Sequence, residues 1–330
     1  MAALNPTVDA IFGRSQAMRS VLEQVVRAAA SRGHLLISGE PGTGREMVAR
    51  EIHRRGVQAH GGFVKIGCAP QPEQDLEFEL FGYSSRGGSS SVERRTLERI
   101  ARGGRLHEAL TGTVFFEHLP ELPARLQARL ARLLRDREAV VVHERAPVNF
   151  SARAIAAIEQ GYDQAVLEGR VRADFHHLIS TIRIELPPLR NRREDIPGLA
   201  AFFVDALCRQ ASVPAKSISQ PAQQLLSALP WHGNASELRR VLQGLVHRVR
   251  GAVIQLEDVL AGVQLDGRAR PLWFRGTLRE ARSRFEGEYI TAMLEQHRGR
   301  ISEAAKALGI QRTNLYRKMR SLRVTREQRH

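Results

Sequence analysis

The feature that most constrains the fold of this chain is a glycine-rich turn that joins an apolar run to a helical pattern. The apolar run lies at residues 33–38, the turn at 39–46 reads Gly-Glu-Pro-Gly-Thr-Gly-Arg-Glu, and the helical pattern continues to Arg55. Consecutive backbone N–H groups of such a turn, followed by a helix N-terminus, can face phosphate oxygens. The sequence therefore predicts a phosphate-binding loop, with the candidate ligand-binding residues Gly39, Gly42, Thr43, Gly44, Arg45 and Glu46. Arg45 stands where such a loop usually has lysine, and its planar guanidinium is bulkier than an ammonium.

Further apolar runs alternate with helical patterns up to about residue 190. Strands are predicted at 112–116, 153–158 and 182–186, and an amphipathic helix rich in Leu and Arg at 121–135. Strands that alternate with helices indicate an α/β domain, in which helices cover both faces of a parallel sheet. From residue 193 onward the predicted elements are all helices, at 195–211, 219–229, 234–250 and 256–261. The arginines of the helix at 121–135 are interpreted as a solvated face, with an auxiliary DNA contact as the alternative.

Basic residues are concentrated in the last fifth of the chain. The 330 residues carry a formal net charge of +15, and residues 268–330 hold 16 Lys or Arg against 6 Asp or Glu. Such a concentration favours a polyanionic partner, with nucleic acid first and an anionic membrane second. No apolar run is long enough to cross a bilayer and the N-terminus does not resemble a signal peptide, so a cytoplasmic, nucleoid-associated protein without a membrane partner is expected. Cys68 and Cys208 lack metal-ligand spacing and are expected to be buried thiols.

Residues 301–319 have the pattern of two short helices joined by a tight turn. Alanines in the first helix allow a close crossing, Gly309 supplies the turn, and Leu315 and Met319 lie on the inner face of the second helix. The start of such a second helix can reach base edges, and its later basic residues can reach phosphates. The predicted DNA-binding residues are Gln311, Arg312, Thr313, Asn314, Tyr316, Arg317, Lys318 and Arg320. The alternative is an ordinary helical hairpin with solvated charges.

The same segment closely resembles the Fis-type helix-turn-helix family. The resemblance rests on Gly299, Ala304, Ala305, Leu308, Gly309, Ile310, Arg312, Leu315, Tyr316, Arg317 and Lys318. It implies that the domain binds double-stranded DNA and forms a homodimer through the preceding helix, predicted at 277–297, with half-sites about one helical turn apart. A polar stretch with Gly and Pro at 263–276 is predicted to be a linker in front of a DNA-binding domain at 277–330.

Residues 10–262 resemble the AAA+ domain of NtrC-type bacterial enhancer-binding proteins, which remodel sigma-54 RNA polymerase. Seven stretches agree in order and spacing, among them Ile11-Phe-Gly-Arg-Ser, Glu79-Leu-Phe-Gly, Gly112-Thr-Val-Phe-Phe and Trp231-His-Gly-Asn. The resemblance implies an AAA+ α/β subdomain at 1–190, a helical lid subdomain at 191–262, ATP or ADP as ligand, and higher oligomers through the AAA+ domain. Because no receiver domain precedes this module, we expect control by a regulatory protein, a small ligand or the expression level.

Several positions of the ATPase machinery depart from the family pattern. The departures are Glu117-His118 in place of Asp-Glu, Ile158-Glu159 in place of Thr-Asn, Leu178 in place of a trans-acting arginine, and Ser236 in place of a sensor arginine. Each such loss can remove orders of magnitude from the rate of phosphoryl transfer. The chain is therefore expected to bind nucleotide through the loop, Glu117 and Arg172 without turnover, and not to be an enzyme.

The motif through which the family engages sigma-54 is also missing from the sequence. In the family, Gly-Ala-Phe-Thr-Gly-Ala follows soon after Glu-Leu-Phe-Gly, whereas here Tyr83 is followed by Ser-Ser-Arg-Gly-Gly-Ser-Ser-Ser. The expected function is a sequence-specific DNA-binding transcriptional regulator that acts independently of sigma-54, with RNA polymerase as one candidate partner. The alternative is a sigma-54-dependent transcriptional activator with ATPase activity.

Overall fold

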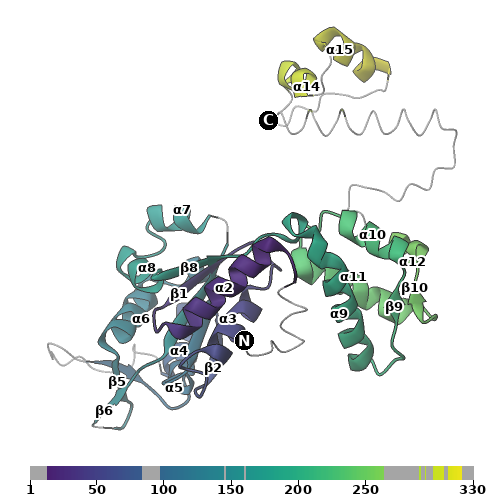
Figure 1. The fold of residues 1–330 in the computed structure, drawn as a ribbon. Helices are drawn as coiled ribbons and strands as arrows, with labels where there is room; N and C mark the ends of the chain where they lie inside the picture. Colours follow the sequence, from purple (N-terminus) through teal and green to yellow (C-terminus); the bar gives the residue numbers. More distant parts are fainter. Residues whose placement is uncertain are drawn as a thin grey trace. The chain divides into compact units, whose positions relative to one another are not determined.

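The chain consists of two compact units, Met1–Val263 and Gln264–His330 (Figure 1). The computed structural model describes residues 13–83, 97–144, 146–159, 161–263, 290, 294, 300–307 and 311–321. The Ser-rich segment after Tyr83, the predicted linker after Val263, Gly309 and all of the predicted 277–297 helix except Ile290 and Leu294 lie outside these residues. Within the described part, no helix combines the length and the apolar character needed to span a bilayer.

A parallel sheet of five strands forms the centre of the first unit, in the order β2-β4-β7-β1-β8 (Figure 1). Its strands are β1 (Leu35–Ser38), β2 (Phe63–Gly67), β4 (Thr113–Glu117), β7 (Arg153–Ile158) and β8 (Ile182–Glu185). Successive residues of β7 alternate between two clusters: Ala154 and Ala156 belong to one, Ile155 and Ala157 to the other. Because a strand points its side chains alternately to opposite faces, both faces of the sheet are buried. The predicted α/β fold with a parallel sheet is therefore confirmed.

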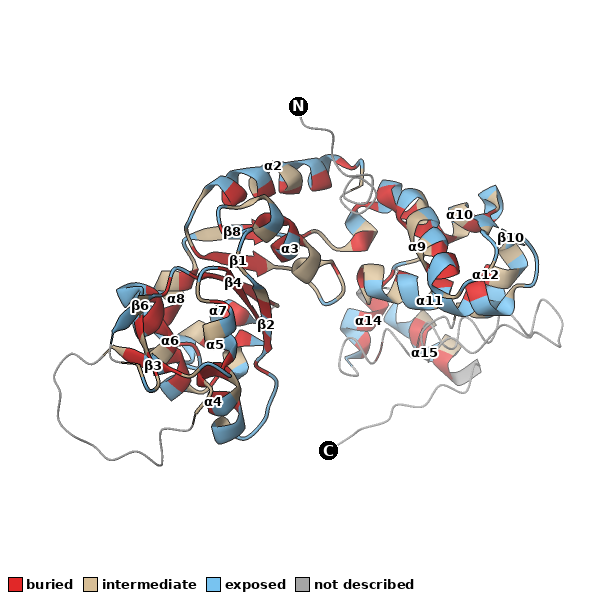
Figure 2. Ribbon diagram, turned by 90° about the horizontal axis from the view of Figure 1, so that it is seen from below, coloured by how far each residue is buried: buried red, intermediate tan, exposed pale blue. Residues whose placement is uncertain are grey.

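Helices cover the two faces of this sheet. Helices α2 (Gln16–Ala30) and α3 (Arg45–Arg55) pack on the face that carries Ile155 and Ala157. The opposite face is covered by α4 (Glu73–Phe81), α5 (Arg105–Glu108), α6 (Ala124–Asp136), α7 (Tyr162–Leu167) and α8 (Ala173–Ile179), with the short helix η2 (Leu119–Glu121). The buried residues follow the central strands and the inner sides of the helices (Figure 2). Burial of apolar surface on both faces supplies the main driving force for this arrangement.

A helical lid follows the last strand of the sheet. Two short helices, η3 (Leu189–Asn191) and η4 (Arg193–Asp195), lead from β8 into α9 (Ile196–Gln210), α10 (Gln220–Ala228), α11 (Asn234–Arg248) and α12 (Leu256–Gly262), and β9 (Ser217–Ile218) pairs with β10 (Val253–Ile254). The lid has its own apolar core, which includes Trp231. The Trp231 Nε1–H donates to the Leu226 carbonyl at 2.6 Å, so the indole packs against the end of α10.

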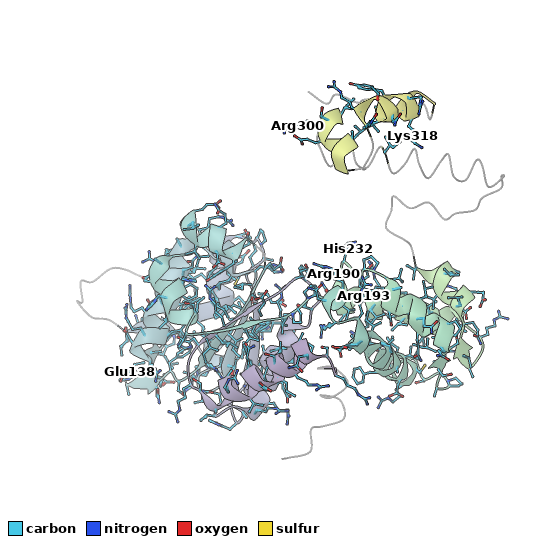
Figure 3. All side chains as sticks on the ribbon, turned by 45° about the horizontal axis from the view of Figure 1, so that its top comes forward. Glu138, Arg190, Arg193, His232, Arg300 and Lys318 are labelled. Atoms are coloured by element: carbon cyan, nitrogen blue, oxygen red, sulfur yellow. The ribbon has the colours of Figure 1, made fainter. Side chains whose placement is uncertain are left out.

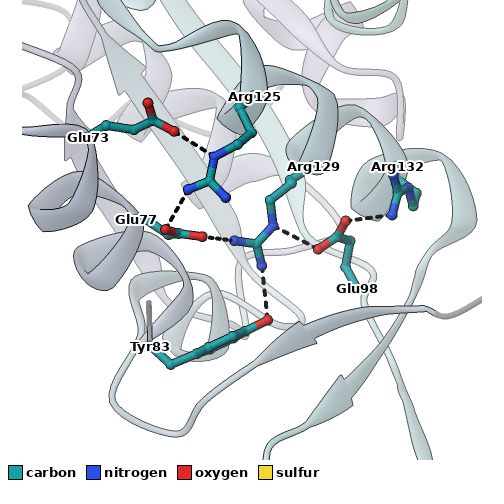
Figure 4. A network of polar contacts seen from close by, with 7 residues as sticks. All are labelled: Glu73, Glu77, Tyr83, Glu98, Arg125, Arg129 and Arg132. Carbon is teal, nitrogen blue, oxygen red and sulfur yellow. Dashed lines mark hydrogen bonds and ion pairs between the residues drawn. The ribbon is translucent and has the colours of Figure 1, made fainter. Parts of the chain in front are cut away.

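A smaller sheet and a buried network of charges lie beside the central sheet. Strands β3 (Glu98–Ile100), β5 (Glu138–Val141) and β6 (Pro147–Asn149) form this second sheet. Arg129 of α6 lies between Glu77 and Glu98, with N–O distances of 2.5 and 3.0 Å (Figure 4). Glu77 is fully buried and Arg129 is only 12% exposed. The interpretation of the α6 arginines as a solvated face is thus wrong for Arg129, which packs into the protein as the partner of two buried carboxylates.

The same network extends to the neighbouring side chains. Its further members are Glu73, Tyr83, Arg125 and Arg132 (Figure 4). The Arg129 guanidinium also stacks over the Phe81 ring, 3.6 Å from its centroid. Tyr83 and Glu98 stand on the two sides of the Ser-rich segment, so α6 anchors the chain both before and after it.

The described part of the second unit is a pair of short helices on a small apolar cluster. Helices α14 (Ile301–Ala307) and α15 (Arg312–Ser321) pack together through Ala304, Ala305, Leu315 and Met319. Ile290 and Leu294 belong to the same cluster, although they come from the preceding segment of the chain. The predicted crossing of a small-residue helix over a second helix is present, and the helix-turn-helix fold is confirmed.

Candidate functional site

The glycine-rich loop connects β1 to α3 with a backbone that only glycine adopts readily. Gly42 and Gly44 have φ angles of +79° and +105°, and Gly44 precedes the first residue of α3. Thr43 turns inward, where its N–H and its Oγ1 both contact the Glu40 carbonyl at 3.3 and 2.8 Å. The loop therefore ends at a helix N-terminus, an arrangement that suits an anionic ligand. All six candidate residues of the loop lie together at the carboxyl edge of β1.

The Arg45 side chain lies inside this site. It donates through Nη1 to the carbonyls of Gly39 and Ile158, at 3.1 and 2.9 Å, and through Nη2 to Glu159 Oε1 at 2.8 Å. Arg45 is 12% exposed and Glu159 is 39% exposed. Arg45 and Glu159 were both interpreted from the sequence as departures from the family pattern, and they form an ion pair with each other. The Arg45 guanidinium, which is larger than a lysine ammonium, is thus neutralised by the Glu159 carboxylate just after β7.

The lid is held on the loop by polar contacts that bridge distant parts of the sequence. Arg190 binds both Glu40 oxygens, at 2.7 and 2.5 Å, and Arg192 donates to the Thr43 carbonyl at 3.0 Å. Fully buried Asn234 donates to Glu40 Oε2 and to the Pro41 carbonyl, at 3.1 and 3.0 Å. The hydrogen bonds from Arg190, followed by that from Asn234, lower the pKa of Glu40 to about 2, so this carboxylate is charged at neutral pH.

The lid also approaches the loop so closely that residue 42 must be glycine. A Cβ atom on Gly42 would lie 2.3 Å from the Gly233 carbonyl oxygen and 3.1 Å from the Ser236 side chain. A cavity of about 190 Å³ opens between Glu40, Pro41, Glu159 and His232. Figure 3 shows Arg190, Arg193 and His232 gathered at this end of the lid. The cavity lies between the loop and the lid, where a ligand would contact both.

A lysine lies between the carboxylates of the helix start and the neighbouring strand end. Lys65 Nζ on β2 is 2.7 Å from Glu46 Oε2 and 2.9 Å from Glu117 Oε2. The hydrogen bond to Glu46 is the main cause that raises the pKa of Lys65. Burial would raise the pKa of Glu46, but hydrogen bonds from Lys65 and Arg50 outweigh burial and lower it. The three groups are therefore an ammonium between two carboxylates.

The remaining candidate residues of the ATPase machinery are spread over other elements. Glu117 ends β4, and the next residue, His118, is exposed with a φ angle of +55°. Arg172 precedes α8 and forms a two-point ion pair with Asp174, at 3.0 and 2.9 Å, rather than with the loop of its own chain. Ser236 lies on α11, close to Gly42. Among the described residues, no cluster of His, Cys, Asp and Glu has the composition of a metal site.

The predicted DNA-reading residues lie on one helix of the second unit. Gln311, Arg312, Thr313, Tyr316 and Arg317 are exposed, and Asn314 and Lys318 are half-buried. Arg317 donates to Asn314 Oδ1 at 3.1 Å, and the Arg312 guanidinium lies 5.7 Å from the Tyr316 ring centroid. Of Arg320 the structure describes the backbone alone. Helix α15 therefore presents a polar, basic outer surface opposite Leu315 and Met319.

Four residues of the candidate nucleotide-binding site were not among the predicted site residues. They are Glu40, Lys65, Arg190 and Asn234. Glu40 was inside the loop motif, and Arg190 and Asn234 were inside stretches that matched the family, so their motifs were visible although their contacts were not. Lys65 had no signal in the sequence, because strand β2 itself was not predicted.

The fold and the site define a phosphate-binding-loop domain of the AAA+ class with a helical lid, followed in the chain by a helix-turn-helix. Comparison with known families agrees. Residues 11–185 match the Sigma-54 interaction domain, residues 190–270 the AAA+ ATPase lid domain, and residues 281–322 the Fis family of bacterial regulatory proteins. The chain belongs to the NtrC-type family of enhancer-binding proteins, and it is a transcriptional regulator with a DNA-binding helix-turn-helix.

Relatives and solved structures of the same organisation cover nearly the whole chain. The DNA-binding transcriptional regulator NtrC of Escherichia coli K12 is 33% identical over 341 residues, which span 96% of this chain and 71% of NtrC. The regulatory protein AtoC of the same organism is 34% identical, over 94% of this chain and 67% of AtoC. The structure of NtrX from Brucella abortus in complex with ATP has a TM-score of 0.68 and 30% identity, and covers 94% of this chain and 69% of that protein.

This membership corrects one expectation from the sequence. The chain was expected not to be an enzyme because several positions of the hydrolytic machinery were interpreted as departures from the family pattern. Its lid matches the AAA+ ATPase lid domain, and its relatives along the full AAA+ module include NtrC and AtoC, so the expectation is wrong.

Proposed function

We propose that this chain is a sequence-specific DNA-binding regulator whose AAA+ domain binds ATP or ADP and which acts on promoters without remodelling sigma-54 polymerase. The observation that carries the proposal is the loop of residues 39–46, whose glycines have positive φ angles and whose Glu40 is bound by Arg190 of the lid. NtrX from Brucella abortus has been solved with ADP and with ATP, which supports the same ligands here. The nucleotide contacts are assigned to Gly39, Gly42, Thr43, Gly44, Arg45 and Glu46, with Arg172 reaching a neighbouring subunit.

The domain limits and assembly follow from the same reasoning. The proposed limits are 1–190 for the α/β subdomain, 191–262 for the lid, 263–276 for a linker and 277–330 for the DNA reader. We assign homodimerisation to the segment 277–297, because a Fis-type reader needs a second copy to read two half-sites. Higher oligomers would form through the AAA+ domain, with Arg172, which pairs with Asp174 in its own chain, acting on a neighbouring copy.

DNA recognition is assigned to α15 and to the residue before it. Arg312→Ala and Arg317→Ala are each expected to weaken binding to the specific site by about fivefold or more, because a good contact to a base edge is worth about 1–3 kcal/mol. Genome-wide mapping of bound DNA supplies the site, and gel-shift titration of that fragment measures the affinity. Arg209→Ala is the matched control, since it removes one exposed positive charge from the lid. Unchanged affinity in both α15 variants would show that the reading helix is assigned wrongly.

The sigma-54 part of the proposal has a separate test. The sequence after Tyr83 lacks the Gly-Ala-Phe-Thr-Gly-Ala motif, so transcription from the bound promoters is expected to respond to this regulator equally in cells with and without sigma-54. A reporter fused to a bound promoter measures the response in both strains. Regulation that disappears with sigma-54 would establish the alternative function, a sigma-54-dependent activator. Neither result would alter the DNA-binding assignment.

A further inference from the structure

The position of Lys65 bears on how a nucleotide is held. Its ammonium connects three elements of the first unit: β2, which carries it, the first turn of α3, which carries Glu46, and the end of β4, which carries Glu117. In phosphate-binding-loop proteins, magnesium is held by the Ser or Thr that follows the loop's basic residue and by the Asp at the end of the neighbouring strand. Those two positions are Glu46 and Glu117 here. Lys65 Nζ therefore lies between the two side chains that would hold the metal.

The arrangement of these residues does not fit a magnesium ion. One oxygen of each carboxylate, Glu46 Oε2 and Glu117 Oε2, is within hydrogen-bond distance of Lys65 Nζ, and Glu46 Oε1 accepts from Arg50 at 2.9 Å. A divalent cation between the same carboxylates would lie against a positive charge at a few ångströms, where like charges repel. Magnesium also demands a near-ideal octahedral set of oxygens, which an ammonium cannot join because it has no acceptor.

We propose that Lys65 takes the place of magnesium in this chain, so that ATP or ADP binds with unchanged affinity when no divalent cation is present. A lysine ammonium is a compact point charge with three rotatable donors. Two of these donors satisfy Glu46 and Glu117, which leaves the third for a phosphate oxygen. The inference rests on the proposed binding of nucleotide at the loop. It concerns which positive charge, the Lys65 ammonium or a magnesium ion, neutralises the phosphates.

The simpler interpretation is that Lys65 forms a surface ion pair with no effect on ligands. Lys65 is 42% exposed, and ion pairs at such exposure contribute little to stability. The two interpretations differ in what happens to nucleotide affinity when magnesium is removed. A surface ion pair leaves the site dependent on magnesium, whereas a resident ammonium makes it independent.

The test is titration of the full chain with ATP and with ADP by calorimetry, in excess magnesium chloride or in excess EDTA. For the unmodified protein the two dissociation constants are expected to agree within about twofold. Lys65→Met is expected to bind about tenfold or more weakly in EDTA, because no ammonium then lies between the phosphates and the carboxylates of Glu46 and Glu117, and magnesium is expected to restore its affinity. Arg50→Met is the matched control. It removes a cation from Glu46 but leaves Lys65 between Glu46 and Glu117, so the nucleotide affinity of this variant should remain independent of magnesium.

The outcomes separate this inference from the proposed function. An unmodified protein that binds nucleotide in magnesium but not in EDTA overturns the role of Lys65 and leaves nucleotide binding intact. A Lys65→Met protein that binds equally well in EDTA also overturns that role. Absence of binding under every condition overturns nucleotide binding itself, together with the inference that rests on it. Thermal melting of each variant shows whether it is folded, and Lys65→Arg, which keeps the charge, should retain binding in EDTA.

Discussion

Arg129→Ala is expected to lower the free energy of unfolding of the first unit by about 3–5 kcal/mol, because it removes the shared partner of two buried carboxylates. Glu77 is fully buried and Glu98 nearly so, and both bind the Arg129 guanidinium. Without it, Glu98 keeps Arg132 and Glu77 keeps Arg125, both of which are far more exposed. The variant also loses the stacking of the guanidinium on Phe81.

Chemical denaturation followed by circular dichroism measures this loss, with Arg135→Ala as the control. Arg135 lies on the same helix but is 63% exposed and pairs with its neighbour Asp136, so its replacement should change the free energy of unfolding by less than about 1 kcal/mol. If the two variants lost equal stability, the buried network would contribute no more than an ordinary surface pair.

Gly42→Ala is expected to weaken ADP binding by about tenfold or more. The added Cβ would meet the Gly233 carbonyl at 2.3 Å, and the φ angle of +79° disfavours any side chain. The loop must then move away from the lid, and its N–H groups lose the orientation that favours a phosphate. Titration with ADP in calorimetry measures the effect.

Gly169→Ala separates the clash from the strain of the backbone. Gly169 has a similar φ angle of +73°, but a Cβ there would meet nothing within 4 Å. The Gly169→Ala variant should therefore lower the free energy of unfolding by about 1–2 kcal/mol, which is the strain of a left-handed residue, and leave ADP affinity unchanged. Equal ADP affinity in the two variants would show that contact between the loop and the lid is not needed for binding.

Sequence patterns predicted most of the central sheet, and the exception has a physical reason. Strands β1, β4 and β7 are buried on both faces, so each is a nearly continuous apolar run. Strand β8 lies at one edge of the sheet and is only partly buried, and it was predicted from the stretch Ile182-Arg-Ile-Glu-Leu. Strand β2 lies at the other edge of the sheet, and its residues alternate between exposed and buried. Lys65 and Gly67 interrupt its apolar character, and five residues of such a pattern do not stand out from a loop.

The site was predicted where its residues are contiguous and missed where they are distant. The glycines of the loop are neighbours in sequence, so their motif is complete in a single stretch. The Glu40 carboxylate meets Arg190 150 residues further on, and Asn234 across 194 residues. Such contacts depend on how the lid folds back, and charge counting along one helix cannot reveal them. For the same reason the partners of Arg129 on α4 and β3 were not foreseen from the pattern of α6 alone.

The apolar cluster of the second unit has a consequence for how the DNA reader could be exchanged between proteins. Helices α14 and α15 are too short to bury an apolar surface by themselves, and part of their cluster comes from Ile290 and Leu294. A recombination or cloning junction placed between Leu294 and Ile301 would separate the reading helix from part of its own support. The transferable module therefore begins upstream of Ile290, and a functional chimera must inherit that segment together with the helix that contacts DNA.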